Sequence, residues 1–307
     1  MPRMPRMIVK GETAVYHVIS RTPLDGLPIK SDDKDFMFAL VKRLSKVYFT
    51  EVIGLTVMSN HFHLLCRMVP EDRFSDGDVT KRFKLYYSSD EDERELTDGQ
   101  IPSFREKWGS LSEFVKEIKQ RFTRYYNKKN NRKGFFWGDR FKSILVQNGE
   151  TLVNCLAYID LNPVRAGMVE KPEQYRWSSL GYHVQTENRD DFFSGDFGFE
   201  AFGMFDFKER MERYRRYVYE AGALESKKGK SIDAGILKKE KAKGFQLTKK
   251  DRFLYKTRCV TDFGIIGSRA FVLENFERFG ELLGVKNDRK PKRIKGLDGI
   301  YSMRRLE

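Results

Sequence analysis

The sequence has few residues of the kinds that build disulfide or multi-cysteine zinc sites. Only three cysteines, Cys66, Cys155 and Cys259, occur in 307 residues, and they are widely separated. This number and spacing exclude a disulfide framework and a zinc cluster, so we expect reduced packing residues. A run of about 18 apolar residues, which a membrane span requires, is also missing. The first seven residues lack the apolar core of a secretory signal, and we therefore expect a cytoplasmic protein.

The charge of the chain points to its class of partner. The formal net charge is +14, and aromatic residues make up 14% of the sequence. A basic and aromatic surface suits a polyanion whose bases or sugars can stack, which favours a nucleic acid. The length is enough for one substantial domain and a second, smaller region.

The first seventy residues alternate between strand-like and helical patterns. Residues 14–21 are β-branched and aromatic, which predicts a strand. Residues 33–48 carry an apolar stripe at helical spacing. Residues 52–58 and 61–68 then predict two strands, and only Ser59 and Asn60 separate them, which is typical of a tight hairpin.

A second helix and strand follow an acidic segment. Residues 71–98 hold ten acidic and five basic residues, and we expect an exposed insertion there. Residues 110–113, Ser-Leu-Ser-Glu, match a capping box that opens a helix. Residues 135–146 predict a strand, and Asn148 is a plausible cap for the next helix. The order β-α-β-β-α-β predicts an α+β protein with a ferredoxin-like split βαβ domain, an antiparallel sheet and helices on one sheet face.

Two of the four histidines lie two residues apart in the predicted strand 61–68. His61 and His63 face the same side of a strand, so their imidazoles project into one space. This arrangement suggests a metal site, although the same spacing also occurs on ordinary exposed strands. His17 is the other strand histidine and could lie near this site, although we favour a packing role and leave it out of the metal set.

The helix after residue 148 contributes a tyrosine and an amide. Tyr158 and Asn162 are four residues apart and therefore share a helix face, turned away from the apolar stripe. They have a plain structural interpretation, in which the tyrosine packs and the asparagine caps the helix before Pro163.

Together these motifs resemble a known family. Residues 58–63 read Met-Ser-Asn-His-Phe-His, residues 158–167 read Tyr-Ile-Asp-Leu-Asn-Pro-Val-Arg-Ala-Gly, and residues 172–182 read Pro-Glu-Gln-Tyr-Arg-Trp-Ser-Ser-Leu-Gly-Tyr. In this order they are similar to the REP-associated tyrosine transposases of the HUH single-strand endonuclease superfamily. The resemblance covers residues 10–184.

The resemblance implies a metal-dependent DNA strand transferase of the transposase kind. The catalytic tyrosine of the family corresponds to Tyr158, and the metal ligands correspond to His61, His63 and Asn162. Related insertion-sequence enzymes have glutamine in place of Asn162, and Asp160 is an alternative third ligand. Neutral imidazoles with oxygen ligands suit Mg²⁺ or Mn²⁺, although they would also accept zinc.

The implied reaction cleaves and rejoins single-stranded or hairpin repeat DNA. It passes through a 5′-phosphotyrosine intermediate, which stores the bond energy, so no nucleotide cofactor is needed. A tyrosine hydroxyl has a reference pKa of about 10, so it is a weak nucleophile until a base, a nearby cation or proximity assists it. The resemblance further implies a bacterial protein of the cytoplasm and nucleoid that acts as a monomer or homodimer.

We expect DNA to follow the basic helix that begins near residue 110. Residues 116–133 contain eight basic residues and one acidic residue, although such a run also occurs on an ordinary solvated helix face. The bases or a hairpin stem would meet an aromatic side chain from the following segment, although each of these aromatics is more often a core residue than a stacking platform. The predicted DNA contacts are Lys116, Lys119, Arg121, Arg124, Lys128, Trp137 and Arg140.

Two domains and two functions remain as hypotheses. We predict a catalytic domain at residues 1–184, with an acidic insertion at about 71–100, and a basic, mainly helical accessory region at 185–307 that binds DNA or packs on the first domain. The alternative function is a non-catalytic protein that binds single-stranded DNA or RNA on the same fold. His183 follows the third motif, and we assign it no chemical role.

Overall fold

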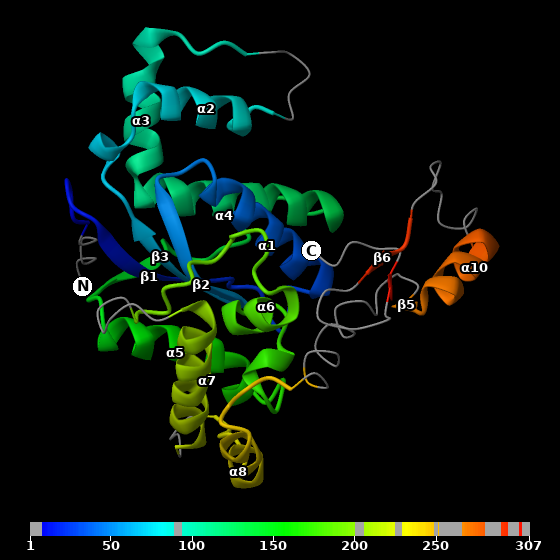
Figure 1. The fold of residues 1–307 in the computed structure, drawn as a ribbon. Coiled ribbons are helices and arrows are strands. Elements are labelled where there is room, and N and C mark those ends of the chain that lie inside the picture. The colour runs from blue at the N-terminus through cyan, green and yellow to red at the C-terminus, as the bar shows by residue number, and fades with distance from the viewer. Residues whose placement is uncertain are drawn as a thin grey trace.

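A four-stranded antiparallel sheet lies at the centre of the protein, and helices cover it on two sides (Figure 1). The computed structural model describes residues 8–88, 94–199, 206–224, 229–248, 251, 266–279, 290–293 and 301–302. The strand order is β2-β3-β1-β4. The strands are β1 Ala14–Arg21, β2 Thr50–Val57, β3 His61–Met68 and β4 Lys142–Val146, and the α-helices that accompany them are α1 Ser31–Ser45, α2 Asp76–Tyr86, α3 Ile101–Gly109, α4 Leu111–Lys129, α5 Glu150–Arg165, α6 Ser179–Thr186, α7 Phe207–Ala223 and α8 Ala234–Ala242.

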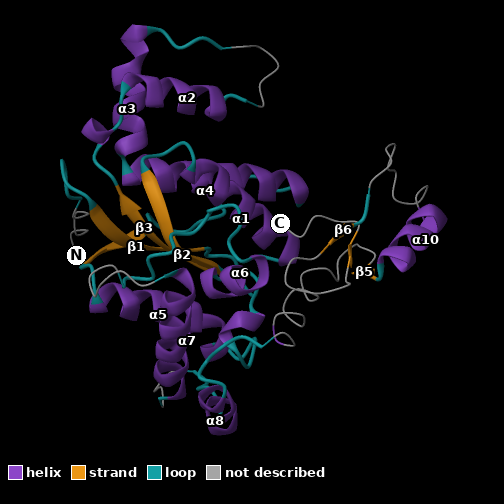
Figure 2. Ribbon diagram, in the orientation of Figure 1, coloured by secondary structure: helices purple, strands orange, loops and turns teal. Residues whose placement is uncertain are grey.

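Shorter elements complete the described chain (Figure 2). Three 3₁₀ turns precede helices α2, α3 and α6 in the chain. Towards the C-terminus, a small three-stranded sheet has the order β5-β7-β6. These elements are the turns Glu71–Arg73, Asp98–Gln100 and Pro172–Gln174, the strands β5 Ile266–Gly267, β6 Lys292–Arg293 and β7 Tyr301–Ser302, and the helix α10 Arg269–Phe279.

The order of the main elements confirms the predicted α+β class and the split βαβ arrangement. Strand β3 pairs antiparallel with both β1 and β2, and β1 pairs antiparallel with β4. The hairpin between β2 and β3 is as tight as predicted, because the Met58 amide donates to the His61 carbonyl at 2.8 Å. Strands β1 and β3 occupy the predicted ranges, since their alternating and apolar residues leave no other consistent register.

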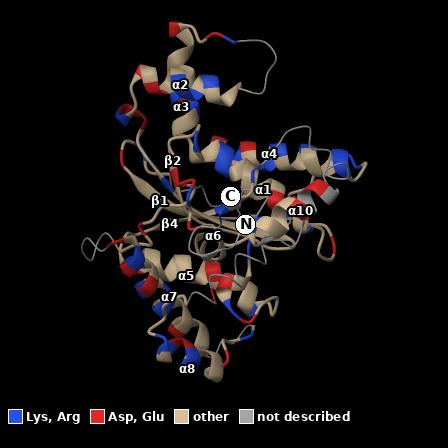
Figure 3. Ribbon diagram, turned by 45° about the vertical axis from the view of Figure 1, so that its right-hand side comes forward, with Lys and Arg blue, Asp and Glu red and all other residues tan. Residues whose placement is uncertain are grey.

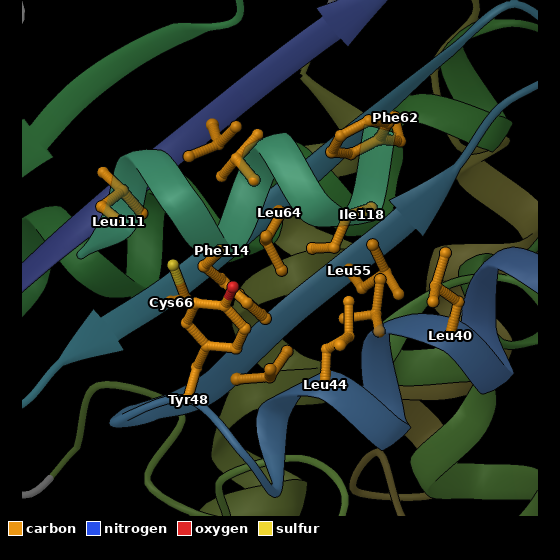
Figure 4. Packing of buried hydrophobic residues seen from close by; sticks show 14 of the residues in the cluster. Leu40, Leu44, Tyr48, Leu55, Phe62, Leu64, Cys66, Leu111, Phe114 and Ile118 are labelled. Atoms are coloured by element: carbon orange, nitrogen blue, oxygen red, sulfur yellow. The ribbon is translucent and has the colours of Figure 1, made fainter. Parts of the chain in front are cut away.

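One face of the sheet packs against α1 and α4. Figure 4 shows Leu44 of α1, Phe114 of α4 and Leu64 of β3 meeting in this core. Cys66 is buried in the same core as a free thiol, which confirms its predicted packing role. Cys155 is a half-buried free thiol, whereas Cys259 lies outside the described residues.

The two helices α1 and α4 of the split βαβ order share that face, whereas the opposite face is covered by α5 and α6, with α7 packed on α5. Val15 of β1 and Leu65 of β3 point to this side and join a second core with Leu156 of α5 and Val218 of α7. Helix α5 buries residues on several sides because it lies between the sheet and α7. A helix enclosed in this way needs a second helical layer to cover its outer side.

Glycine 54 sets how closely α5 approaches the sheet. A Cβ atom at this position would lie 2.4 Å from Cδ1 of Leu156. We expect Gly54→Ala to lower the free energy of unfolding by about 1–3 kcal/mol, because the core would be overpacked. Gly77→Ala is the control, since its nearest neighbour would be the Ser75 Oγ atom at 3.6 Å. Urea unfolding of both variants tests this, and equal midpoints would contradict the close approach.

The acidic segment is not simply an exposed insertion. Helix α2 forms within it, and Ser75 caps the helix by accepting a hydrogen bond from the Asp78 amide at 3.2 Å. Val79 and Phe83 on this helix are buried in the core cluster that contains α1 and α4. The high acidic content concealed this short apolar stripe. Residues 89–93 lie outside the described residues.

The predicted strand at 135–146 is shorter than expected. Only Lys142–Val146 pairs with β1, whereas the preceding residues wrap around the end of that strand. The Thr22 hydroxyl donates to the Phe136 carbonyl at 2.5 Å, and the Gly138 amide donates to the Arg21 carbonyl at 3.0 Å. The side chains of Phe136 and Trp137 enter the core cluster, because burying these rings is favoured over extending the ladder.

Helix α7 packs on α5, and a buried ionic network ties it to the turn Pro172–Gln174 and to α8. Arg215 donates through Nε to Glu173 at 2.6 Å and forms an ion pair with Glu240 of α8 at 3.1 Å. The Tyr219 hydroxyl donates to the second Glu173 oxygen at 2.9 Å. The part of the accessory region that the structure describes here therefore packs on the predicted catalytic domain. None of the described helices has the length and apolar composition that a membrane span needs.

Candidate active site

Three histidines meet on the sheet face that α5 covers. His61 and His63 of β3 lie on this side, while Phe62 between them enters the opposite core. The register of β1 against β3 adds His17, whose Nε2 atom lies 3.0 Å from Nδ1 of His63. The two rings are stacked with their centroids 5.2 Å apart. His17 therefore lies beside the histidine pair, which is one of the two positions that the sequence left open.

Helix α5 brings Tyr158 over this histidine cluster, which consists of His17, His61 and His63. The tyrosine ring centroid lies 5.7 Å from that of His63 and 6.1 Å from that of His17. Both contacts are edge-on, with interplanar angles of 87° and 73°. Tyr158 is nevertheless 42% exposed, so its side chain is held on one side and open to solvent on the other. A substrate can reach the side chain without displacing the core.

Burial keeps the three imidazoles neutral. It lowers the pKa of His17 to about 4 and, with a smaller contribution from the Arg21 charge, that of His61 to about 4. The pKa of His63 falls to about 2, chiefly through burial and further through the neighbouring histidines and Arg21. A neutral imidazole keeps a lone pair on one nitrogen, which is the form that binds a metal ion.

Hydrogen bonds orient the two histidines of the predicted metal set. The Nδ1 atom of His61 lies 2.6 Å from Oδ1 of Asn60, which can only accept, so Nδ1 carries the proton. The lone pair of His61 is then on Nε2. If His63 donates through Nδ1 to His17, its Nε2 atom has a lone pair as well. Such outer hydrogen bonds are typical of metal-ligating histidines, so these residues fit a divalent cation.

Asn162 lies one helical turn beyond Tyr158. Its Nδ2 atom donates to the carbonyl oxygens of Tyr158 and Ile159, at 2.8 and 3.4 Å. The amide oxygen is the atom that could serve as a ligand. Among the described residues, no group of three or more His, Cys, Asp or Glu side chains has an arrangement that could hold a metal ion. The predicted metal set has only two side chains of these types, His61 and His63, because its third member is the amide of Asn162.

Asp160 does not supply the third ligand. Its side chain is fully buried on another side of α5, where it accepts from the Tyr214 hydroxyl at 2.6 Å and the Ser179 hydroxyl at 2.8 Å. The Leu180 amide donates to it at 3.1 Å. Burial raises the pKa of Asp160 to about 6, against the opposing effect of these bonds. Asp160 instead ties the Tyr158 helix to α6 and α7.

The predicted DNA contacts on helix α4 lie on a different side of the sheet from the histidine cluster. Helix α4 packs with α1 on the face opposite α5, and Lys and Arg residues are spaced along its ribbon (Figure 3). Several of these side chains already have partners. Lys116 pairs with Glu113 at 3.1 Å, Arg121 pairs with Glu117 at 2.6 Å, and Lys119 donates to the Asp139 carbonyl at 3.0 Å; Arg124, Lys128 and Arg140 are exposed.

Trp137 does not present a ring to solvent. It is 5% exposed and packs edge-on against Phe62, with the ring centroids 5.2 Å apart. Its Nε1 atom donates to the Lys119 carbonyl at 3.2 Å. The interpretation of Trp137 as a stacking platform was therefore wrong for this structure, because the ring completes the core between the sheet and α4.

The sequence did not indicate two arginines of the site, Arg165 beside Tyr158 and Arg21 beside His61. The guanidinium carbon of Arg165 lies 5.4 Å from the Tyr158 ring centroid, and Arg21 pairs with His61 across β1 and β3. Arg165 lies seven residues after Tyr158, which is two helical turns, so helical spacing could have indicated it. Arg21 follows only from the register of the two strands.

Comparisons with known proteins give a likeness at the level of structure. No family model matches the chain, and no curated protein matches it either. Among solved structures, the chain is similar to one described as the REP-associated tyrosine transposase bound to a REP hairpin. The match has 16% sequence identity and a TM-score of 0.42, and it covers 64% of this chain and 93% of that chain.

Proposed function

We propose that this protein is a metal-dependent single-strand DNA endonuclease and strand transferase with Tyr158 as its nucleophile. The observation that carries the proposal is the position of Tyr158. Its ring lies edge-on to His17 and His63, the Arg165 guanidinium lies over it, and it remains open to solvent. A solvent-open tyrosine beside neutral imidazoles and a cation suits attack on a phosphodiester better than a packing role.

The proposed step exchanges one phosphoester for another. The Tyr158 oxygen attacks phosphorus and forms the new P–O bond, and the bond from phosphorus to the 3′ oxygen breaks. The 3′ oxygen takes a proton from solvent and leaves as a hydroxyl, and the phenolic proton passes to solvent, to which Tyr158 is open. The strand is then held as a 5′-phosphotyrosine. A second 3′-hydroxyl reverses the exchange and rejoins DNA without ATP.

Cationic side chains at the site support phosphate binding. The Arg165 guanidinium lies over the Tyr158 ring, and Arg21 lies across the strand pair from His61. Guanidinium groups bind phosphate oxygens through paired hydrogen bonds, so these two arginines would orient the scissile phosphate. They would also offset the negative charge that the phosphate brings to the neutral histidine cluster.

His61, His63 and Asn162 would hold a divalent cation, Mg²⁺ or Mn²⁺, beside this phosphate. When bound, the cation supplies Lewis-acid stabilisation of the charge on the phosphate oxygens. The neutral imidazoles and the hydrogen bond from His61 to Asn60 support this assignment. The Asn162 oxygen is the third ligand of the proposal.

The remaining DNA would run from this site around the sheet to α4. The exposed Arg124 and Lys128 are suited to its backbone, and Arg140 lies in the segment that links α4 to β4. A hairpin stem is long enough to contact both sides of the sheet. We therefore propose hairpin-forming repeat DNA as the substrate, handled by a monomer or a homodimer.

The test uses labelled hairpin DNA from repeats that flank the gene. With the full chain and Mn²⁺, we expect a protein–DNA adduct that survives denaturing electrophoresis, and removal of the cation with EDTA should abolish it. Added Mn²⁺ should then restore the adduct. If several repeat hairpins bind without forming an adduct, the protein is a non-catalytic nucleic-acid-binding protein on the same fold.

A further inference from the structure

His183 on α6 is a buried histidine that no hydrogen bond satisfies. It is 2% exposed, and neither ring nitrogen has a hydrogen-bond partner within the described part of the chain. Aromatic rings surround it, with centroids at 4.8 Å for Phe197, 5.6 Å for Phe193 and 5.8 Å for Phe207. Unsatisfied buried polar groups are rare in folded proteins, and each one calls for an explanation.

The state of this imidazole defines what it could bind. Burial lowers the pKa of His183 to about 3, against a small opposing effect of Asp190, so the ring is neutral near pH 7. A neutral imidazole offers one N–H donor and one acceptor nitrogen. A guest beside it would therefore need an acceptor and a donor of its own.

His183 lines a cavity of about 360 Å³ between α6 and α7. This volume falls in the range of small-molecule sites, which runs from about 300 to 1,000 Å³. Most of the wall is apolar or aromatic, and His183 is the buried polar group in it whose ring atoms have no partner. The apolar wall consists of Val184, Phe207, Met211, Phe245 and Leu247.

Each charged residue that lines the cavity has a partner of opposite charge. Lys208 and Glu212 approach to 4.0 Å, and Glu187 pairs with Arg189 at 2.8 Å. Arg215 is held by Glu173 and Glu240. Because these charges compensate each other, the interior favours a neutral guest over an ion.

We propose that this cavity is a nucleobase pocket, an inference that rests on the proposed DNA-processing function. A nucleobase is neutral and planar, and it carries donors and acceptors side by side on its edge, which complements the His183 ring. Its faces suit the rings of Phe207 and Phe245. The sugar and phosphate would stay outside, where the side chain of Lys208 is 72% exposed.

The pocket is connected to the candidate active site through α6. The first residues of that helix, Ser179 and Leu180, bind Asp160 on the Tyr158 helix at 2.8 and 3.1 Å, and His183 follows one turn later. A base held at His183 would fix the position of a strand relative to Tyr158. The pocket would thus select where on the DNA the protein acts.

Saturation-transfer NMR with the four deoxynucleosides tests the pocket on the full chain. We expect transfer to the base protons of at least one nucleoside. His183→Phe keeps the ring but removes its donor and acceptor, and it should weaken binding by at least about tenfold without lowering the melting temperature. Met211→Trp, which fills the cavity, should also abolish the transfer. Arg213→Met on the exposed side of α7 is the control and should leave it unchanged.

If the wild-type protein shows no transfer to any nucleoside, the proposal of a nucleobase pocket is wrong. Equal transfer in wild type, His183→Phe and Met211→Trp would also contradict the proposal, because the nucleosides would then bind elsewhere. If the wild type forms the Tyr158 adduct in either case, the proposed function stands without the pocket. If the nucleosides bind His183 but no adduct forms, the proposed function fails and the pocket remains.

Hairpins with single abasic positions identify the source of the base. If the base belongs to the bound strand, one abasic position should weaken wild-type binding by at least about tenfold and should have little effect on His183→Phe. If every abasic position affects the two proteins alike, while nucleosides still bind, the pocket takes a free nucleoside.

Discussion

Tyr158→Phe should abolish the covalent DNA adduct while leaving DNA binding nearly unchanged. The substitution removes only the hydroxyl oxygen and keeps the ring that packs edge-on to His17 and His63. Loss of a nucleophile typically lowers the rate by a factor of at least about 1,000. The Kd for hairpin DNA should change by less than about threefold, which corresponds to about 0.6 kcal/mol. Denaturing gels measure the adduct, and a filter-binding assay measures the Kd.

Tyr125→Phe is the matched control. The Tyr125 ring stacks on Phe36 with the centroids 3.8 Å apart, on the sheet face opposite α5. Loss of the Tyr125 hydroxyl should not affect formation of the adduct. A normal adduct from Tyr158→Phe would show that another residue is the nucleophile. Tyr182 is the tyrosine to test next, although its hydroxyl donates to Asp190 at 2.5 Å, and Tyr16 and Tyr126 are buried.

Arg215→Met should be the most destabilising single substitution that we predict. Arg215 and the two carboxylates that it binds, Glu173 and Glu240, are each no more than 1% exposed. Removal of the cation would leave two buried carboxylates without their shared partner. Breaking a buried ion pair from one side typically costs about 3–5 kcal/mol. Urea unfolding monitored by circular dichroism gives this difference.

Arg213→Met on the same helix separates burial from charge. Arg213 is exposed and pairs with Glu209 at 3.2 Å, so its replacement should change the free energy of unfolding by less than about 0.5 kcal/mol. Adding Glu173→Gln to Arg215→Met should recover part of the loss, because the buried Glu173 carboxylate would otherwise have lost its cation. Glu240 keeps Lys171 and Lys243 as partners, at 2.9 and 3.0 Å. If Arg215→Met and Arg213→Met unfold at the same urea concentration, α7 is not part of the cooperative core.

The division of the chain into two domains at residue 184 stays a prediction.

Local patterns in the sequence account for most of the elements that were predicted. Strand β3 begins at His61 because the two-residue turn before it allows only one hairpin register. Helix α4 starts at the predicted Ser110, whose hydroxyl accepts from the Glu113 amide at 3.3 Å. The misjudged segments depended on distant partners. Residues 135–141 leave the sheet because Phe136 and Trp137 find a core formed by α4, which no local pattern reveals.

In the candidate site, too, local patterns indicated some residues, whereas distant contacts decided others. Strand periodicity and helical spacing, joined to the family resemblance, selected His61, His63, Tyr158 and Asn162 from the sequence. His17 could not be assigned to the cluster, because its contact with His63 depends on how β1 pairs with β3, 46 residues away. Asp160 remained an alternative ligand in the sequence, because the contact that buries it is with Tyr214, which lies 54 residues away in the chain.

The sequence by itself determined the α+β class, the order of the main elements and the residue types of the candidate site. These follow from interactions within about one helical turn or one hairpin, which periodicity records directly. Only the tertiary structure decided that α5 lies across the sheet from α4. It also decided that a third histidine joins the pair and that Trp137 is a core residue. Those outcomes depend on pairing and packing between distant segments, whose free energies no local pattern encodes.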